Sequence, residues 1–197
     1  LPPDVNESQL DFAVVEGKIR FGLSAVKNVG EPAARAIIRA REQGGPFESI
    51  WDFCERVDPA AANKRALDSL VKCGALDSTG ASRMGMLHVL EDALSYGQKQ
   101  QQDRLLGQAS IFDLGGGAED EPQRHHPPVV GPELGRKELL AFEKETLGLY
   151  LTDHPLAEVA DQLRRRVDLP LRDLAGRREH DTVSVGGLVA SLRVTTS

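Results

Sequence analysis

The chain has 197 residues, of which 40% are hydrophobic, and its formal net charge is −6. This length and composition suit one sizeable core, or one core with a smaller unit and a linker. No signal peptide is evident, and no apolar run approaches the roughly 20 residues that cross a bilayer, so we expect a globular protein without a membrane partner. The negative charge argues against strong nonspecific binding of nucleic acid by the whole chain.

The ends of the chain and its two cysteines suggest what kind of protein this is. The sequence starts at Leu1 rather than at Met and stops at Ser197, inside a segment that reads as a β-strand. We therefore expect a fragment of a longer protein that carries part of its function. Cys54 and Cys73 lack the spacing and the histidine companions of a metal site, which indicates buried free thiols in a reducing cytoplasm and no bound metal.

The first predicted elements lie before residue 45. Two β-prone runs, 12–15 and 19–23, flank Gly17 and predict a β-hairpin. Apolar residues at helical spacing then predict two short helices joined at residues 28–32. Gly30 is expected at positive φ in this connection, and Pro32 suits the first turn of the second helix.

Further helices are predicted from caps and apolar spacing. They begin at Ser49, at about Asn63 with an end at Gly74, and at Asp77 or Ser78. Residues 107–131 are rich in Gly, Pro, Glu and His and predict a linker. Helices over 132–146 and 157–166 follow, and residues 182–194 read as a β-strand.

The connection at residues 28–32 has the pattern of a helix-hairpin-helix. A glycine hairpin lets successive N–H groups approach a phosphate, and the helix that follows adds its positive N-terminal end. Such a site binds duplex DNA without reading bases. The predicted contacts are made by Lys27, Asn28, Val29, Gly30, Glu31 and Arg35, with added attraction from Arg39. The alternative is an ordinary helical corner closed by glycine.

A second glycine hairpin follows about 44 residues later. It predicts further phosphate contacts by Lys64, Arg65, Lys72, Gly74 and Ala75. Between residues 17 and 73, ten Lys and Arg residues stand against seven acids, an excess of three positive charges in an acidic chain. The alternative is that this second hairpin is only a packing corner.

The segments around these hairpins carry a family resemblance. They include KIRFGLSAVKNVG at 18–30, GPF at 45–47, LVKCGALD at 70–77 and FEKETLGLYL at 142–151. In this order, and over nearly the whole chain, they closely resemble the alpha subunit of bacterial DNA polymerase III. The fold class expected is mainly α: a tandem helix-hairpin-helix domain with a small N-terminal β-hairpin, a linker, helices and the incomplete start of an OB-fold.

The resemblance implies a domain order. It makes residues 1–10 the end of a fingers region, 11–106 the duplex-binding domain, 107–131 a linker, 132–180 a helical connector and 181–197 the first strand of a truncated OB-fold. The catalytic aspartates of the family, and the Mg that they bind, would lie before Leu1. No catalytic residue, metal or cofactor is therefore assigned to this chain, which would belong to a cytoplasmic, nucleoid-associated bacterial DNA-directed DNA polymerase.

Residues 108–112 (QASIF) place two large apolar side chains in polar surroundings. The resemblance implies that this segment binds the sliding clamp, the beta subunit, through Gln108, Ser110, Ile111 and Phe112. Burial of Ile111 and Phe112 in a pocket supplies roughly 3–6 kcal/mol before ordering costs. The alternative is a loop that packs Phe112 on its own domain.

Two functions from different classes follow from these patterns. The first is a noncatalytic segment of a replicative polymerase that binds duplex DNA, the sliding clamp and other polymerase III holoenzyme subunits. The second is a free-standing helix-hairpin-helix adaptor in DNA repair. His125 and His126 are expected to be solvated linker residues, His154 to cap or pack a turn, and 164–166 to be a solvated helix end.

Overall fold

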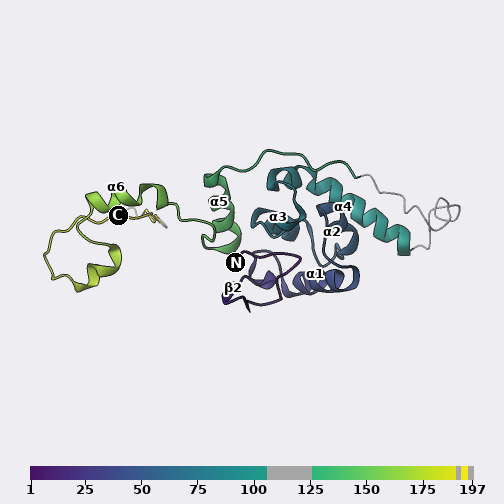
Figure 1. Cartoon of the computed structure of the whole chain (residues 1–197), viewed down its shortest axis with the longest axis horizontal. Helices are drawn as coiled ribbons and strands as arrows, with labels where there is room; N and C mark the ends of the chain where they lie inside the picture. The colour runs from purple at the N-terminus through teal and green to yellow at the C-terminus, as the bar shows by residue number, and fades with distance from the viewer. Residues whose placement is uncertain (106–125, 190–191, 195–197) are drawn as a thin grey trace. The chain divides into compact units, whose positions relative to one another are not determined.

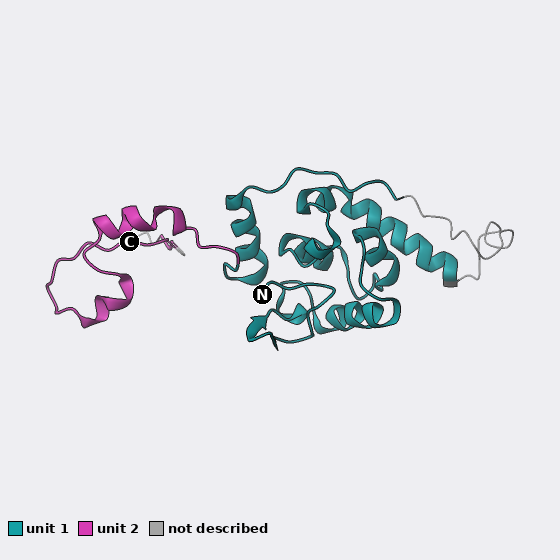
Figure 2. Cartoon of the chain, in the orientation of Figure 1, with its two compact units in different colours: residues 1–151 teal, residues 152–197 magenta. Residues whose placement is uncertain are grey.

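The computed structural model describes residues 1–105, 126–189 and 192–194. It divides the chain into two compact units, Leu1–Leu151 and Thr152–Ser197 (Figure 2). Unit 1 is mainly helical, as the sequence predicts.

Unit 1 opens with the predicted β-hairpin. Strands β1 (Ala13–Val15) and β2 (Lys18–Arg20) pair antiparallel, with Ala13 opposite Arg20. The two turn residues, Glu16 and Gly17, have φ of 52° and 74°. Positive φ at both central residues matches the right-handed twist of the flanking strands, which explains why a two-residue loop suffices.

The α-helices described in unit 1 follow this hairpin (Figure 1). They are α1 (Glu31–Gly44), α2 (Ile50–Arg56), α3 (Lys64–Lys72), α4 (Arg83–Leu105) and α5 (Arg136–Leu147). Ser49 accepts a hydrogen bond from Asp52 N, and Asn63 accepts from Arg65 N and Ala66 N, so the predicted starts of α2 and α3 are confirmed. Local caps fix these starts because they need no tertiary partner.

The core of unit 1 is formed by residues of the N-terminal segment and of helices α1 to α5. Helices α2 and α4 approach so closely that a Cβ on Gly97 would lie 2.2 Å from the Cys54 carbonyl oxygen. One turn further along α4, Gln101 Nε2 donates to three carbonyls at the end of α2, those of Cys54, Glu55 and Val57. Cys54 and Cys73 are both buried free thiols, as predicted.

Three helix boundaries differ from the prediction, one of them the start of α5, which lies at Arg136 rather than at 132. The segment before residue 28 holds only the 3-10 turn η1 (Leu23–Ala25), since the chain must bend back to place Val26 and Val29 in the core. The helix expected from Asp77 or Ser78 is instead the 3-10 turn η2 (Asp77–Thr79), which ends at Gly80 with φ of 82°. Helix α4 begins after this left-handed residue because positive φ cannot continue a helix.

His126 is packed rather than solvated, so that expectation is wrong. Its ring stacks on Trp51 with centroids 5.3 Å apart and meets Tyr96 edge-on at 4.8 Å. Its Nε2 lies 3.2 Å from a carboxylate oxygen of Glu55, a buried residue. This packing of His126 could not be predicted from the sequence, because its aromatic partners lie on α2 and α4, far from it in the chain.

Unit 2 contains η3 (Ala157–Val159), α6 (Ala160–Arg166) and η4 (Leu171–Gly176). His154 Nδ1 accepts a hydrogen bond from Leu156 N at 3.2 Å, the turn-capping role expected for it. Residues 182–189 and 192–194 form no strand, which corrects the prediction for 182–194. The described backbone pairing of this segment is limited to Ser184 with Asp168, and a strand needs a neighbour to satisfy its N–H and C=O groups. An OB-fold start stays a prediction from the resemblance.

Candidate nucleic-acid interface

The first hairpin, residues 26–30, is a tight turn between η1 and α1. Val29 N donates to the Val26 carbonyl at 3.0 Å, and Asn28, the third residue of this turn, has φ of 65°. Gly30 has φ of −72°, so the positive φ expected at Gly30 occurs at Asn28 instead. Asn tolerates this region better than most residues, and that preference was the available sequence signal.

The N-terminus of α1 has no side-chain acceptor, unlike the other α-helix starts described in unit 1. Gly30 is its N-cap and has no side chain to accept from the first turn. The starts of the other four helices each use a side-chain acceptor: Ser49 at α2, Asn63 at α3, Ser82 at α4 and Glu138 at α5. Within the described residues, the N–H groups of Asn28, Gly30 and Glu31 donate to no protein acceptor. Free N–H groups at a helix start favour an anion.

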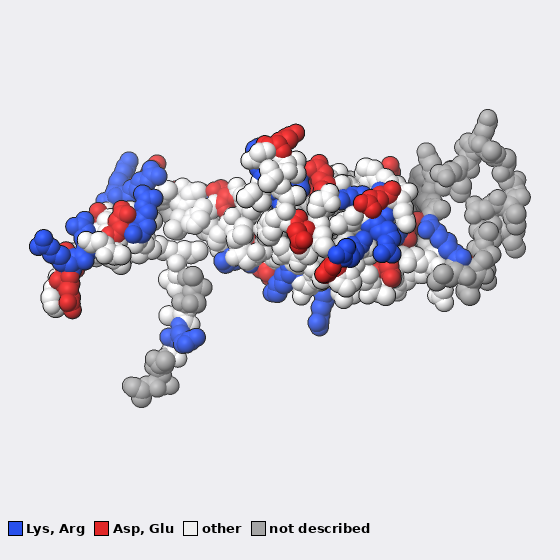
Figure 3. All heavy atoms as spheres, turned by 90° about the horizontal axis from the view of Figure 1, so that it is seen from below, with Lys and Arg blue, Asp and Glu red and all other residues white. Residues whose placement is uncertain are grey.

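Three cations lie along the same stretch of chain. Lys27 and Arg39 are exposed and have no ion pair among the described residues, and Arg35 pairs only with Glu31, at 2.7 Å, with both side chains about 60% exposed. Arg35 and Arg39 line a hollow of about 310 Å³ beside α1. Figure 3 shows Lys and Arg side chains gathered, together with some acids, on the face that carries α1. We call Lys27, Gly30, Arg35 and Arg39 the hairpin face.

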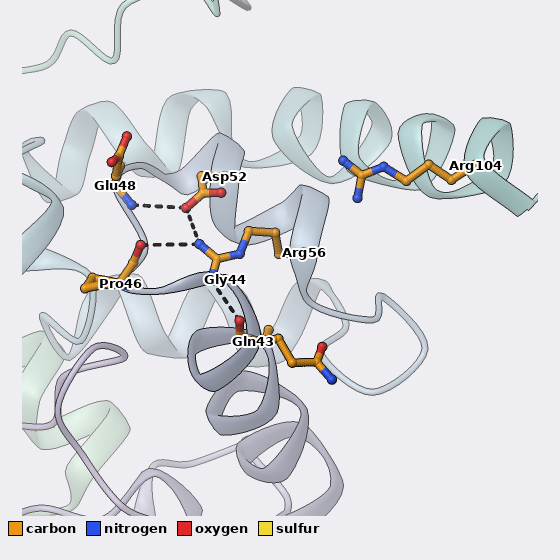
Figure 4. A pocket seen from close by; sticks show the side chains of 8 residues that line it. Gln43, Gly44, Pro46, Glu48, Asp52, Arg56 and Arg104 are labelled. Atoms are coloured by element: carbon orange, nitrogen blue, oxygen red, sulfur yellow. Dashed lines mark hydrogen bonds and ion pairs between the residues drawn. The ribbon is translucent and has the colours of Figure 1, made fainter. Parts of the chain in front are cut away.

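Arg56 lies close to α1, but its guanidinium is bonded to other groups of the protein (Figure 4). Its guanidinium donates to the carbonyls of Ala40 and Gly45 at 2.8 and 2.6 Å and pairs with Asp52 at 2.8 Å. It also lies 4.5 Å above the Phe47 ring. These contacts cap the C-terminal end of α1, so both terminal nitrogens of the Arg56 guanidinium are already bonded within the fold.

The second hairpin forms the C-terminal end of α3. Gly74 N donates to the Val71 carbonyl and Ala75 N to the Leu70 carbonyl, at 3.0 and 2.9 Å. With Gly74 at φ of 81°, this pair of bonds is the Schellman ending of α3. Both residues are buried, and a Cβ on Gly74 would lie 2.1 Å from the Arg83 guanidinium. Neither N–H is therefore available to a phosphate in this arrangement, which favours the alternative interpretation of this hairpin.

The cations around the second hairpin are also largely occupied. Lys72 pairs with Asp68 at 2.9 Å and with Glu145 of α5 at 3.3 Å, and its side chain is 20% exposed. The hydrogen bond to Asp68 is the main cause that raises the pKa of Lys72. Lys64 pairs with Glu91, whereas Arg65 is exposed without an ion pair in the described part of the chain. The N–H groups and cations of the first hairpin are therefore more available to a ligand than those of the second. No bound DNA tests either set of predicted contacts.

The predicted clamp-binding residues, Gln108, Ser110, Ile111 and Phe112, lie outside the described residues. Both flanks of that segment are fixed to α2. On one side Gln101 bonds to the end of α2 and Arg104 lies 3.7 Å from Glu55; on the other, His126 lies against Trp51 and Glu55.

The described residues contain no group of three or more His, Cys, Asp or Glu side chains placed to hold a metal ion. None of the helices in this part of the chain is long and apolar enough to span a membrane.

The open helix start lies within the part of the chain that resembles a known motif. Residues 1–86 match the helix-hairpin-helix motif family. This range includes the 26–30 hairpin, α1 and the Gly74 corner, and it ends in the first turns of α4.

Curated relatives cover more of the chain. It is 38% identical over 198 residues to DNA polymerase III subunit alpha of Vibrio cholerae, which covers 100% of the chain and 17% of that protein. The subunit of Thermus aquaticus is 45% identical over 184 residues, 90% of the chain and 14% of the relative. That of Mycobacterium leprae is 40% identical over 98% of the chain and 16% of the relative. The chain thus spans about a sixth of the relatives that it matches.

Proposed function

We propose that the chain is a noncatalytic segment of a replicative DNA polymerase, and that its hairpin face binds the primer-template duplex through phosphates. The observation that supports this most is the open start of α1, where unpaired N–H groups and three exposed cations lie inside the region that matches the helix-hairpin-helix family. Contacts of this kind hold DNA in place without specifying its sequence. Similarity to polymerase subunits along nearly the whole chain favours this function over a repair adaptor.

A matched pair of substitutions at Gly30 tests the backbone contact. The φ of −72° at Gly30 suits proline, so Gly30→Pro removes the N–H donor with little change in this angle. Gly30→Ala keeps the N–H, and its Cβ would lie 3.5 Å from the nearest heavy atom, an ordinary contact. Fluorescence anisotropy with a primed duplex should show weaker binding by Gly30→Pro than by Gly30→Ala. Equal affinity of the two variants would remove the backbone contact from the proposal.

The cations of the hairpin face are tested by the triple variant Lys27→Ala, Arg35→Ala, Arg39→Ala. We expect it to lose most duplex affinity, since these three side chains supply the nearby positive charge. Lys99→Ala, an exposed cation on α4, is the control and should bind almost as wild type. Retained binding by the triple variant would place the DNA contact elsewhere.

We further propose that Gln108, Ser110, Ile111 and Phe112 bind the sliding clamp and so keep the polymerase on DNA during synthesis. The support is the QASIF sequence, with the contacts that the flanking residues Gln101 and His126 make to α2. In a pull-down with the clamp, Gln108→Ala with Phe112→Ala should abolish retention, and Asp113→Ala should not. Retention of the double variant would rule this peptide out.

A further inference from the structure

We propose that Asn28, Ser69 and the C-terminal end of α5 are positioning elements of the DNA site, which hold the 26–30 hairpin in the conformation that binds phosphate. The inference rests on the proposed function of the hairpin face. Two hydrogen bonds from elements distant in sequence support this inference, and both are made to residues of the 26–30 hairpin.

The first contact comes from α3. Asn28 Nδ2 donates to the Ser69 hydroxyl oxygen at 2.9 Å, across 41 residues of sequence. Ser69 is 2% exposed and lies on the inner face of α3, so its hydroxyl is a fixed acceptor. Asn28 has φ of 65°, a left-handed conformation that costs free energy for a residue with a Cβ. The hydrogen bond to Ser69 offsets part of this cost and fixes the direction of the turn.

The second contact comes from α5. Lys27 N donates to the Thr146 carbonyl at 2.9 Å, in the last turn of that helix. The last four carbonyls of a helix lack intrahelical donors, so a hairpin amide and a helix carbonyl satisfy each other here. Helix α5 is kept in place by Leu147, which is 8% exposed in the core of unit 1, and by Glu145, which pairs with Lys72 of α3. Helix α5 lies outside the matched residues 1–86, so the residues that match the motif do not include this contact to the hairpin.

These two contacts leave the DNA-facing donors unpaired. The Lys27 amide is occupied by α5 and the Asn28 amide group by α3, while the backbone N–H groups of Asn28, Gly30 and Glu31 find no acceptor within the described residues. A turn that must be ordered on binding loses affinity to that ordering, and a preorganised turn does not. Loss of either contact should therefore weaken duplex binding although no charge changes.

A double-mutant cycle tests the Asn28–Ser69 contact. Asn28→Gly keeps positive φ accessible and removes the side chain, and Ser69→Ala removes the acceptor; both are neutral changes. Each single variant should bind the primed duplex about 3- to 10-fold more weakly than wild type, the range of a single side-chain hydrogen bond. The double variant should bind no more than about 2-fold more weakly than either single variant, because both remove one interaction.

The α5 contact is tested with two leucines of the same chain. Leu147→Ala should release the end of α5, speed hydrogen exchange at the Lys27 amide and weaken duplex binding several-fold. Leu149→Ala, at a side chain that is 41% exposed, is the matched control and should change neither. Far-UV circular dichroism distinguishes local release from unfolding.

The outcomes separate the two proposals. If wild type binds duplex and Asn28→Gly, Ser69→Ala and Leu147→Ala all bind equally well, the positioning inference is wrong and the proposed function stands. If the effects of Asn28→Gly and Ser69→Ala add fully in the double variant, the contact between them is not the cause. If wild type itself does not bind duplex, both proposals fail together.

Discussion

The partners of each cation determine whether it can attract DNA. Arg56 and Lys72 are both surrounded by acceptors, and each holds two elements together. Lys27 and Arg39 are equally basic in sequence but have no ion pair among the described residues. An excess of positive charge along a stretch of sequence therefore overstates what is available to a ligand, because a paired cation has already given its donors to the fold.

The two buried thiols give a prediction about pH. Burial raises the pKa of Cys54 and of Cys73 to about 12, from an ordinary value of 9.0. The folded chain keeps these thiols protonated, whereas the unfolded chain can ionise them above about pH 9. Their contribution to stability is therefore complete below pH 9 and decreases as the pH rises from 9 toward 12.

Urea unfolding at pH 7, 9 and 10 checks this. Wild type should lose stability over that range more steeply than the variant Cys54→Ala, Cys73→Ala, in which the titrating groups are absent. Lys and Tyr titrate in both proteins, so the difference between the two slopes is the reported quantity. Parallel slopes would contradict the assignment.

The helix ends described here depend on local hydrogen bonds, whereas the crossing of two helices depends on a tertiary contact. Ser49 and Asn63 start α2 and α3 through hydrogen bonds to their own first turns, which any chain with these residues can form. The end of α3 at Gly74 is also local, since both bonds of its Schellman motif join residues no more than five apart. The crossing of α2 on α4 is different, because it depends on a glycine at the point of contact.

Gly97→Ala tests that crossing. In an isolated helix this change is stabilising by about 1 kcal/mol, but here the new Cβ would meet the Cys54 carbonyl at 2.2 Å. We expect a net loss of about 1–3 kcal/mol in the free energy of unfolding, because overpacking separates the helices. Thermal or urea unfolding measures it. Ser95→Ala, on the exposed side of the same helix, is the control and should be neutral or slightly stabilising.

At the scale of the whole molecule, a net charge of −6 limits how tightly the chain holds DNA. The hairpin face offers three cations and a few N–H groups, so only about three phosphates are neutralised. The logarithm of duplex affinity should fall against the logarithm of salt concentration with a slope of about −3.

Anisotropy titrations between low and moderate salt on two duplexes of unrelated sequence measure this. The two duplexes should bind alike, because backbone donors and cations contact phosphates and read no bases. A clear preference for one sequence, or a slope well beyond −3, would show that the interface is larger than the hairpin face.

Much of the fold could be predicted from the sequence because its signals are local. The β-hairpin around Gly17, the caps at Ser49 and Asn63 and the end of α3 at Gly74 all depend on residues a few positions apart. The 182–194 strand could not be judged in this way, since strand formation depends on a neighbour that apolar alternation does not supply. The start of α4 was misplaced because Gly80, three residues past Asp77, ends the turn before a helix can form.

For the site, the sequence by itself determined the residue types of two glycine hairpins and the cations beside them. Only the tertiary structure separated the two hairpins. It left the start of α1 open, brought Ser69 and Thr146 to the turn at Asn28, and buried Gly74 and Ala75, with Gly74 beside Arg83. The physical reason is that a donor is available to a phosphate only when no acceptor elsewhere in the fold has taken it, and those acceptors come from helices up to 119 residues away.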